Sequence, residues 1–355
     1  MAAALPMTLT LRDGPTVGRL GFGAMRVTGP GIWGPPRDEA EAVALLRRVV
    51  DKGVTFIDTA DSYGPGISES LIAKALYPYP AGLVIATKGG LVRPGPDRWN
   101  TDCRPEHLRR ACAESLQRLR VERIDLYQLH AVDYRVPLED SVGALIDLKA
   151  EGKIRHIGLS NVSAAELARA QRLTPIVSVQ NHYNLRDRSG DALVDACAAA
   201  GIAFIPWYPL AAGRLAAPGA TLSRIANDHG ATPAQVALAW LLHRSPTMLS
   251  IPGTALDRPF RGEPRRRCTA PQRRRSGRAL RPLTREAHFR SGQSEAAEEL
   301  LIPCDASDFG RRINARAEAV WGEFSNGSSC GCNAFNRWTA SALVNWYWAA
   351  AAPGT

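Results

Sequence analysis

The sequence predicts an α/β protein in which residues 1–255 form one (β/α)8 TIM barrel. Short apolar, β-branched runs alternate with amphipathic helical patterns, which is typical of parallel βαβ units. Eight strand patterns occur, with seven helical patterns between them, and eight parallel strands close a barrel of this kind. The length of this part of the chain is also the usual size of the fold, roughly 250 residues.

The strand and helix patterns follow one another in a regular order after a hairpin signal at Asp13-Gly14. Strands are expected at residues 19–24, 55–59, 83–87, 123–129, 153–159, 176–180, 203–207 and 248–252. Helices are expected at residues 38–52, 67–76, 104–119, 138–151, 163–171, 189–200 and 232–243. Thr232-Pro233 has the residue types of an N-cap followed by the first helical position, which supports the last of these helices.

The chain changes character after residue 255. Residues 256–290 hold twelve arginines and three acidic residues, and prolines at positions 259, 264 and 271 would interrupt a helix there. The eighth barrel helix should begin soon after Thr254, but this stretch cannot form it. We therefore expect a barrel domain at 1–255 and an aberrant, disordered Arg/Pro-rich tail at 256–355 in place of the eighth helix and the C-terminal segment.

Composition and charge exclude several classes of protein. Hydrophobic residues make up 45% and charged residues 22% of the chain, which excludes a collagen, a disulfide miniprotein and a fully disordered chain. The net charge of +10 comes from the one arginine run, so we expect no specific nucleic-acid partner. We find no membrane-spanning run and no signal peptide. Seven cysteines without framework or metal-ligand spacing favour the cytoplasm and no metal site.

Four titratable side chains stand at the ends of successive strand patterns, where barrel enzymes place catalytic groups. They are Asp58 and Tyr63 in DTADSYG, Lys88 in ATKGG and His130 in LYQLH. An ammonium beside a tyrosine lowers the pKa of the hydroxyl, and a carboxylate holds that ammonium in place. An imidazole can orient a carbonyl oxygen or relay a proton. Each residue alone could be structural, but the four together suit protonation of a carbonyl oxygen while another group delivers hydride.

Further motifs occur in a fixed order: LGFGAM, FIDTADSYG, TKGG, DLYQLH, IRHIGLSN, VQNHYN, PWYPL and SIPGT. Over residues 8–255 this series resembles the aldo-keto reductase superfamily. The resemblance implies a (β/α)8 barrel that uses NADPH, without metal, to reduce small aldehydes or ketones. It implies that Tyr63 is the general acid, that Lys88 and Asp58 tune it, and that His130 orients the substrate.

The same resemblance implies which residues bind the cofactor. Ser160, Asn161 and Gln180 would hold the nicotinamide carboxamide, Trp207 would stack on the ring, and Tyr208 and Leu210 would begin the loop over the pyrophosphate. The full implied set is Gly23, Met25, Asp58, Ser160, Asn161, Gln180, Trp207, Tyr208 and Leu210.

Two segments, TGPGIWGPP (28–36) and ALYPY (75–79), resemble the bacterial pyridoxal reductase branch of the superfamily. This implies pyridoxal or similar small aldehydes as substrates. Trp33 and Trp99 follow the first and third strands, so they could line an aromatic substrate pocket or simply pack in loops. Two other functions remain open: a non-catalytic nucleotide-binding barrel, like potassium-channel β-subunits, and an inactive truncated product. The oligomeric state is also open.

The family's eighth helix follows SIPGT and opens with a pattern like His-Leu-x-Glu-Asn, which residues 256–280 lack. A permitted reverse translation of these residues, read one base later, gives STAHFEENLAAAALHLSAEEAVERL. This reading contains His-Phe-Glu-Glu-Asn and forms an amphipathic helix of good helix formers. We therefore expect a frameshift near residues 255–256, and we call the corrected sequence the frame-restored chain. A lineage-specific basic tail is the alternative.

Overall fold

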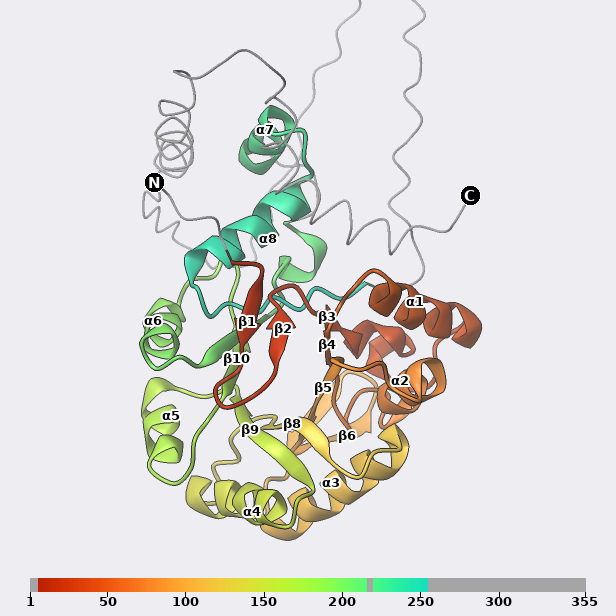
Figure 1. The fold of residues 1–355 in the computed structure, drawn as a ribbon, viewed down its shortest axis with the longest axis vertical. Helices are drawn as coiled ribbons and strands as arrows, with labels where there is room; N and C mark the ends of the chain where they lie inside the picture. The colour runs from red at the N-terminus through yellow and green to blue at the C-terminus, as the bar shows by residue number, and fades with distance from the viewer. Residues whose placement is uncertain (1–5, 216–219, 255–355) are drawn as a thin grey trace, which may run out of the picture.

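A computed structural model represents the protein and describes residues 6–215 and 220–254 (Figure 1). The expected tail at 256–355, the position of the eighth helix and the expected frameshift all lie outside these described residues. The two-part division of the chain therefore stays a prediction.

The described residues form a curled parallel sheet of seven strands in the order β11-β10-β9-β8-β5-β4-β3. The bounds are β3 Phe22–Gly23, β4 Phe56–Asp58, β5 Val84–Gly89, β8 Ile124–Leu129, β9 Ile154–Ser160, β10 Ser178–His182 and β11 Ala203–Trp207. Each of these strands overlaps the range predicted for it from the sequence.

The predicted eighth strand joins the two edges of this sheet. Leu249 N donates to Phe204 O of β11 at 2.9 Å, and Ser250 N donates to Arg19 O at 2.9 Å. Gly21 N in turn donates to Ser250 O at 2.8 Å, next to the parallel bridge between Leu20 and Ser250. The eighth strand is thus present as isolated bridges, and its hydrogen bonds close the ring of parallel strands.

Helices cover the outside of the strands (Figure 1). Their bounds are α1 Glu39–Asp51, α2 Ile67–Leu76, α3 Pro105–Leu119, α4 Leu138–Ala150, α5 Ala164–Gln171, α6 Asp191–Ala199 and α8 Pro233–Arg244. The predicted N-cap at Thr232 is confirmed, because its side chain accepts from Gln235 N and forms a capping box. Ser163 caps α5 in the same way.

A small apolar cluster fills the inside of the barrel. It contains Phe56, Val84 and Ile205 from the strands, together with Val17 and, at its margin, Leu9. The last two residues belong to the predicted hairpin, formed by β1 (Thr8–Thr10) and β2 (Thr16–Gly18). Because Phe56 and Val84 begin their strands, the hairpin covers the N-terminal end of the barrel, and the C-terminal end stays open.

Several short elements were not predicted from the sequence. They are the hairpin of β6 (Leu91–Gly95) and β7 (Arg98–Thr101), the helix α7 (Ala220–Asp228), and the 3-10 helices η1 (Ala24–Val27), η2 (Pro30–Ile32) and η3 (Ala211–Gly213). All of them follow the C-terminal ends of barrel strands. Except for α7, which packs against α8, they lie at the end of the barrel where catalytic groups are expected.

Candidate active site

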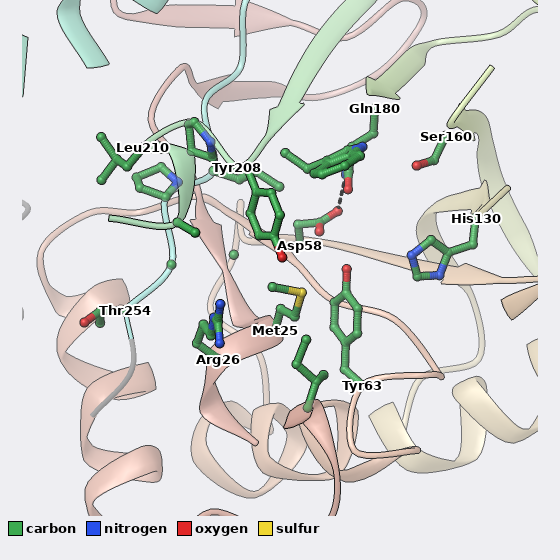
Figure 2. Close-up of a pocket in the computed structure, with 18 of the residues that line it drawn as sticks. Met25, Arg26, Asp58, Tyr63, His130, Ser160, Gln180, Tyr208, Leu210 and Thr254 are labelled. Atoms are coloured by element: carbon green, nitrogen blue, oxygen red, sulfur yellow. Dashed lines mark hydrogen bonds between the residues drawn. The ribbon is translucent and has the colours of Figure 1, made fainter. Parts of the chain in front are cut away.

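The C-terminal end of the barrel contains a cavity of about 560 Å³ (Figure 2). Of the predicted site residues, Lys88 and Trp33 do not line this cavity. The predicted residues that do line it are Gly23, Met25, Asp58, Tyr63, Trp99, His130, Ser160, Asn161, Gln180, Trp207, Tyr208 and Leu210.

Tyr63 lies on a tight turn directly after β4. Tyr63 N donates to Ala60 O at 3.2 Å, and Ser68 N donates to Tyr63 O at 3.1 Å as α2 begins. Gly64 has a φ of +88°, and a Cβ there would lie 2.5 Å from the Cβ of Ile67. Only glycine fits this position without strain, so the Tyr-Gly pair of DTADSYG fixes where the phenol points.

Lys88 lies beneath the cavity and joins the other members of the proton-transfer set. Its ammonium donates to Asp58 Oδ1 at 2.6 Å, to Thr59 O at 2.8 Å and to Tyr63 Oη at 3.3 Å. The Lys88 side chain is fully buried. The structure thus brings together three of the four titratable residues predicted from the strand ends.

The other oxygen of Asp58 is held by two glutamines. Gln180 Nε2 donates to Asp58 Oδ2 at 2.8 Å (dashed in Figure 2), and Gln128 Nε2 donates at 3.2 Å. Burial alone would lower the pKa of Lys88, but Asp58 and Tyr63 outweigh burial and raise it. Lys88 therefore remains an ammonium ion at neutral pH, inside an otherwise closed environment.

The pKa of Tyr63 shifts opposite to the direction expected from the sequence. Burial raises the pKa of the phenol, and the Lys88 ammonium offsets only part of that rise, while Asp58 adds to it. The expectation counted the neighbouring charge but not the loss of water around a side chain that is 6% exposed. Tyr63 is therefore a protonated phenol at neutral pH.

His130 stands beside Tyr63 as a neutral imidazole. The two ring centroids are 5.8 Å apart, and His130 Nδ1 lies 3.3 Å from Ser62 Oγ. Burial lowers the pKa of His130 well below its usual value, and the nearby Lys88 ammonium lowers it further. The ring can therefore donate or accept a hydrogen bond near neutral pH without carrying charge.

Asn161 connects the His130 side of the cavity to Trp207. Its Nδ2 donates to His130 O at 2.9 Å, and its Oδ1 accepts from Trp207 Nε1 at 3.0 Å. The backbone of Asn161 is left-handed, with a φ of +56°. On the other side, the His182 ring centroid lies 4.5 Å from that of Trp207. The indole at the end of β11 is thus held in place by contacts from two neighbouring strand ends.

The two tryptophans proposed for the substrate pocket occupy different places. Trp99 in β7 lines the cavity, and its ring centroid lies 6.4 Å from those of both Tyr63 and His130. Trp33 lies outside the cavity lining and packs in its loop, where it bridges to Gly64. The sequence left two alternatives open for these tryptophans. Trp33 packs in its loop, whereas Trp99 forms part of the cavity wall.

Sequence reasoning missed Arg93, the residue that holds this wall. Its guanidinium donates to Ile32 O at 2.8 Å, Ser62 O at 3.2 Å, Gly31 O at 2.8 Å and Arg98 O at 2.7 Å. It also lies 3.7 Å from the ring centroid of Trp99. The only indication in the sequence is an arginine inside the otherwise uncharged run Leu-Val-Arg-Pro. Nothing in that run shows which loops it joins.

Comparisons with known proteins agree with this geometry. The Aldo/keto reductase family matches residues 19–257. The chain is 51% identical over 239 residues to an uncharacterized oxidoreductase of Schizosaccharomyces pombe, covering 67% of this chain and 78% of that one. It is 44% identical over 246 residues to pyridoxine 4-dehydrogenase of Escherichia coli, covering 68% and 86%. An aldo-keto reductase from Klebsiella pneumoniae in complex with NADPH superposes with a TM-score of 0.60 at 30% identity, covering 71% and 86%.

The chain belongs to the aldo/keto reductase family. It is an oxidoreductase of the class that reduces carbonyl groups with NADP(H), as predicted from the ordered motifs. The similarity to pyridoxine 4-dehydrogenase supports the branch-level resemblance of TGPGIWGPP and ALYPY.

The lining of the cavity fits the cofactor. Amide and hydroxyl side chains of Asn161, Gln180 and Ser160 stand beside the partly exposed indole of Trp207. Their donors and acceptors suit a carboxamide group, and the indole suits the planar ring that carries it. Residues 6–215 and 220–254 contain no helix long and apolar enough to cross a membrane. The same described residues hold no cluster of three or more metal-ligating side chains.

Proposed function

We propose that this protein reduces small aromatic aldehydes of the pyridoxal type to alcohols, with Tyr63 as the general acid. The observation that carries the proposal is the hydrogen-bonded set Tyr63–Lys88–Asp58. Tyr63 and Asp58 line the cavity together with Trp99 and His130, and Lys88 lies beneath it. The substrate class is supported by the aromatic wall and by the relative named pyridoxine 4-dehydrogenase.

The proposed reaction divides the work between cofactor and protein. When bound, NADPH would provide the hydride that reduces the carbonyl carbon. Tyr63 gives its phenolic proton to the carbonyl oxygen, and the Lys88 ammonium at 3.3 Å stabilises the phenolate left behind. Asp58 keeps Lys88 charged and in place. His130, neutral at working pH, donates a hydrogen bond that orients the carbonyl oxygen but does not compete as the acid.

We assign the cofactor-binding residues along the same cavity. Ser160, Asn161 and Gln180 would hold the carboxamide, and Trp207 would stack on the nicotinamide ring. The other proposed contacts are Gly23, Met25, Asp58, Tyr208 and Leu210, which line the remainder of the groove. Free thiols at the three described cysteines are compatible with a cytoplasmic location.

The test is Tyr63→Phe, with Tyr134→Phe as the control because Tyr134 is 87% exposed. Removing only the proton donor should lower kcat by ~10²–10⁴ and leave the Kd for NADPH nearly unchanged. The assay is NADPH oxidation with pyridoxal as the aldehyde, in both the 355-residue and the frame-restored chain. Near-normal turnover in Tyr63→Phe would remove Tyr63 from the reaction. NADPH binding without turnover of any aldehyde would favour the non-catalytic barrel.

We also propose that the chain is frameshifted near residues 255–256, so that the domain at 1–255 precedes out-of-frame sequence. The arginine- and proline-rich composition of 256–290 supports this, and the family match ends at residue 257. The decisive observation is the nucleotide sequence across codons 250–285. A sequence that cannot encode His-Phe-Glu-Glu-Asn in the shifted frame would contradict the proposal and favour a lineage-specific tail.

A further inference from the structure

Asp97 lies on the turn between β6 and β7 and lines the cavity, but the reaction proposed above does not use it. The other carboxylate among the described lining residues, Asp58, is paired with Lys88 at 2.6 Å. The one cation in that lining is Arg26, which stands beside Met25 on the wall assigned to the cofactor (Figure 2). Within the described part of the chain, no salt bridge joins Asp97 to a basic residue. The charge of Asp97 is therefore available to a ligand.

The carboxylate of Asp97 is held against the loop that contains η2. Asp97 N donates to Gly31 O at 3.1 Å. Gly31 has a φ of +66°, and a Cβ there would lie 2.9 Å from Asp97 Oδ2, so only glycine leaves room for the carboxylate. Ile32, the next residue, packs in one apolar cluster with Tyr63. Asp97 therefore lies against the loop that also contacts the proposed general acid.

The arginine on the same hairpin does not neutralise Asp97. Arg93 has five N–H groups, and each of them is directed at a backbone carbonyl. These carbonyls belong to Gly31, Ile32, Ser62, Gly95 and Arg98. The guanidinium thus fixes the backbone around the turn, while the Asp97 carboxylate has no cation paired with it and is exposed at the cavity.

The hairpin runs from the reacting end of the cavity to Asp97. β6 begins directly after β5, the strand that contains Lys88, and the turn at Asp97 is the far end of the hairpin. Trp99 lies between these two ends, with its ring centroid 6.4 Å from those of both Tyr63 and His130. Figure 2 shows the Tyr63 hydroxyl and the His130 ring facing the same part of the cavity. An aromatic aldehyde that is held there and lies along Trp99 directs its opposite end toward the turn.

We propose that Asp97 selects aldehydes whose aromatic ring carries a positive charge opposite the carbonyl group. The ring nitrogen of pyridoxal stands para to its aldehyde, and as a pyridinium it can donate a charge-assisted hydrogen bond to a carboxylate. A neutral benzaldehyde has no such group, so it gains nothing from Asp97. This assignment rests on the proposed function, because it concerns the far end of the same substrate.

An aspartate at this turn also has a purely structural explanation. The backbone of Asp97 is left-handed, with a φ of +53°, and aspartate and asparagine both adopt this conformation more readily than most residues. Asp97→Asn therefore keeps the size of the side chain and the preference of the backbone, and it removes only the charge. A structural role predicts that this variant behaves like the unsubstituted protein, whereas a role in selecting the substrate predicts a loss that depends on the charge of the aldehyde.

The experiment measures kcat and KM for two aldehydes of the same shape, 4-formyl-N,N,N-trimethylanilinium, which is a cation, and 4-tert-butylbenzaldehyde, which is neutral. Pyridoxal is the third substrate. The proteins are the unsubstituted chain, Asp97→Asn and Glu41→Gln. Glu41→Gln is the matched control, because Glu41 is an exposed carboxylate that lines only a smaller neighbouring cavity. All are made in the 355-residue and the frame-restored chain, and thermal unfolding and the Kd for NADPH are recorded for each.

Asp97→Asn should raise the KM for the cationic aldehyde and for pyridoxal by about three- to fivefold, the effect of losing one partly exposed ion pair. It should leave kcat unchanged, because the pair forms equally in the ground state and the transition state. The KM for the neutral aldehyde, the Kd for NADPH and Tm should not change. In the unsubstituted chain, added salt should raise the KM for the cation and not that for its neutral counterpart. Glu41→Gln should preserve the preference for the cation.

Two results would overturn the assignment while leaving the proposed function intact: an unchanged preference for the cation in Asp97→Asn, or equal losses for the cationic and the neutral aldehyde. The second would show that Asp97 only shapes the wall. If Asp97→Asn unfolds, the salt dependence of the unsubstituted chain decides, and equal responses of the two aldehydes would contradict the assignment. If pyridoxal alone is reduced, an unchanged KM for pyridoxal in Asp97→Asn would contradict it. Unsubstituted chains that bind NADPH but reduce no aldehyde would overturn this assignment and the proposed function together.

Discussion

Replacing Arg93 with methionine should open the substrate side of the cavity and leave the cofactor side intact. Arg93 is 9% exposed, and its guanidinium bonds the carbonyls of Gly31, Ile32, Ser62 and Arg98. These carbonyls belong to three separate segments that meet around Tyr63 and Trp99. Methionine keeps the apolar stem but removes every donor, so the segments lose their common attachment.

The magnitude follows from these contacts. A hydrogen bond to a charged group contributes about 1.5–3 kcal/mol, but the contributions do not add, and carbonyls near the mouth can bond water instead. The guanidinium lies 3.7 Å from the Trp99 ring centroid, a cation–π contact worth roughly 0.5–2 kcal/mol. We expect a net loss of about 2–4 kcal/mol in the free energy of unfolding. For a domain of this size that lowers Tm by roughly 5–12 °C.

The assay combines thermal unfolding with steady-state kinetics and NADPH titration. Arg93→Met should raise the KM for pyridoxal more than it changes the Kd for NADPH. Arg93→Lys should recover little, because an ammonium cannot reach several carbonyls in the fixed fork of a guanidinium. Arg98→Met is the control, since Arg98 lies on the same hairpin and contributes only its carbonyl. If Arg93→Met melts and binds substrate like Arg98→Met, Arg93 does not hold this wall.

Two further predictions concern cofactor binding by Trp207 and the buried carboxyl group of Asp61. Trp207→Ala should raise the Kd for NADPH and reduce the fluorescence change on binding. Trp33→Ala is the control, because Trp33 lies outside the cavity, and it should change neither. If the two variants gave the same NADPH titration curve, Trp207 would be excluded from the site. Burial raises the pKa of Asp61 well above the value of about 3.9 in the unfolded chain, so stability falls as pH rises from about 3.9 toward the raised pKa of the folded chain. Asp61→Asn should therefore gain about 1 kcal/mol over the unsubstituted chain at neutral pH but not near pH 4. Glu122→Gln, on an exposed bend outside any helix, should gain at neither pH. Urea midpoints at the two pH values provide the measurement.

The sequence predicted the barrel well because its evidence is local. The apolar run at 203–207 and the helical pattern at 67–76 match β11 and α2 residue for residue, since burial of one strand or one helix face leaves a periodic pattern. The titratable residues Asp58, Tyr63 and His130 were found because they follow strand ends, whereas the cofactor-binding residues came from the resemblance of the ordered motifs to a known family. Closure of the barrel then brings these strand ends together, and any eight parallel strands that close a barrel do so.

The features that sequence reasoning missed depend on contacts distant in the chain. Arg93 bonds backbone carbonyls of Gly31 and Ser62, and a backbone carbonyl leaves no trace in residue type. The direction of the Tyr63 pKa shift depends on how completely water is excluded, which only packing decides. Asp61 lies inside the DTADSYG motif, yet its buried Oδ1 has no hydrogen-bond partner among the described residues, a property visible only in three dimensions.

The expected frameshift lies after the residues proposed for catalysis, so it should affect the stability of the barrel more than the reaction. Every member of the proton-transfer set precedes residue 131, and the last hydrogen bonds that close the barrel involve residues 247–252. A frame change after residue 255 leaves these groups intact but removes a helix that would bury several leucine-sized side chains, each worth roughly 1.5–3 kcal/mol. That sum is comparable to the whole stability of a domain, about 5–15 kcal/mol.

Frame restoration should therefore raise soluble yield and Tm and lower the Kd for NADPH, because the segment it restores would cover the barrel and contact the adenosine. Near-equal kcat values at saturating NADPH and low temperature should remain, since Tyr63, Lys88 and Asp58 are common to both chains. Thermal unfolding and NADPH titration of the two chains, side by side, provide the measurement. A 355-residue chain that melts cooperatively and binds NADPH as tightly as the restored one would show that its own C-terminal hundred residues complete the fold.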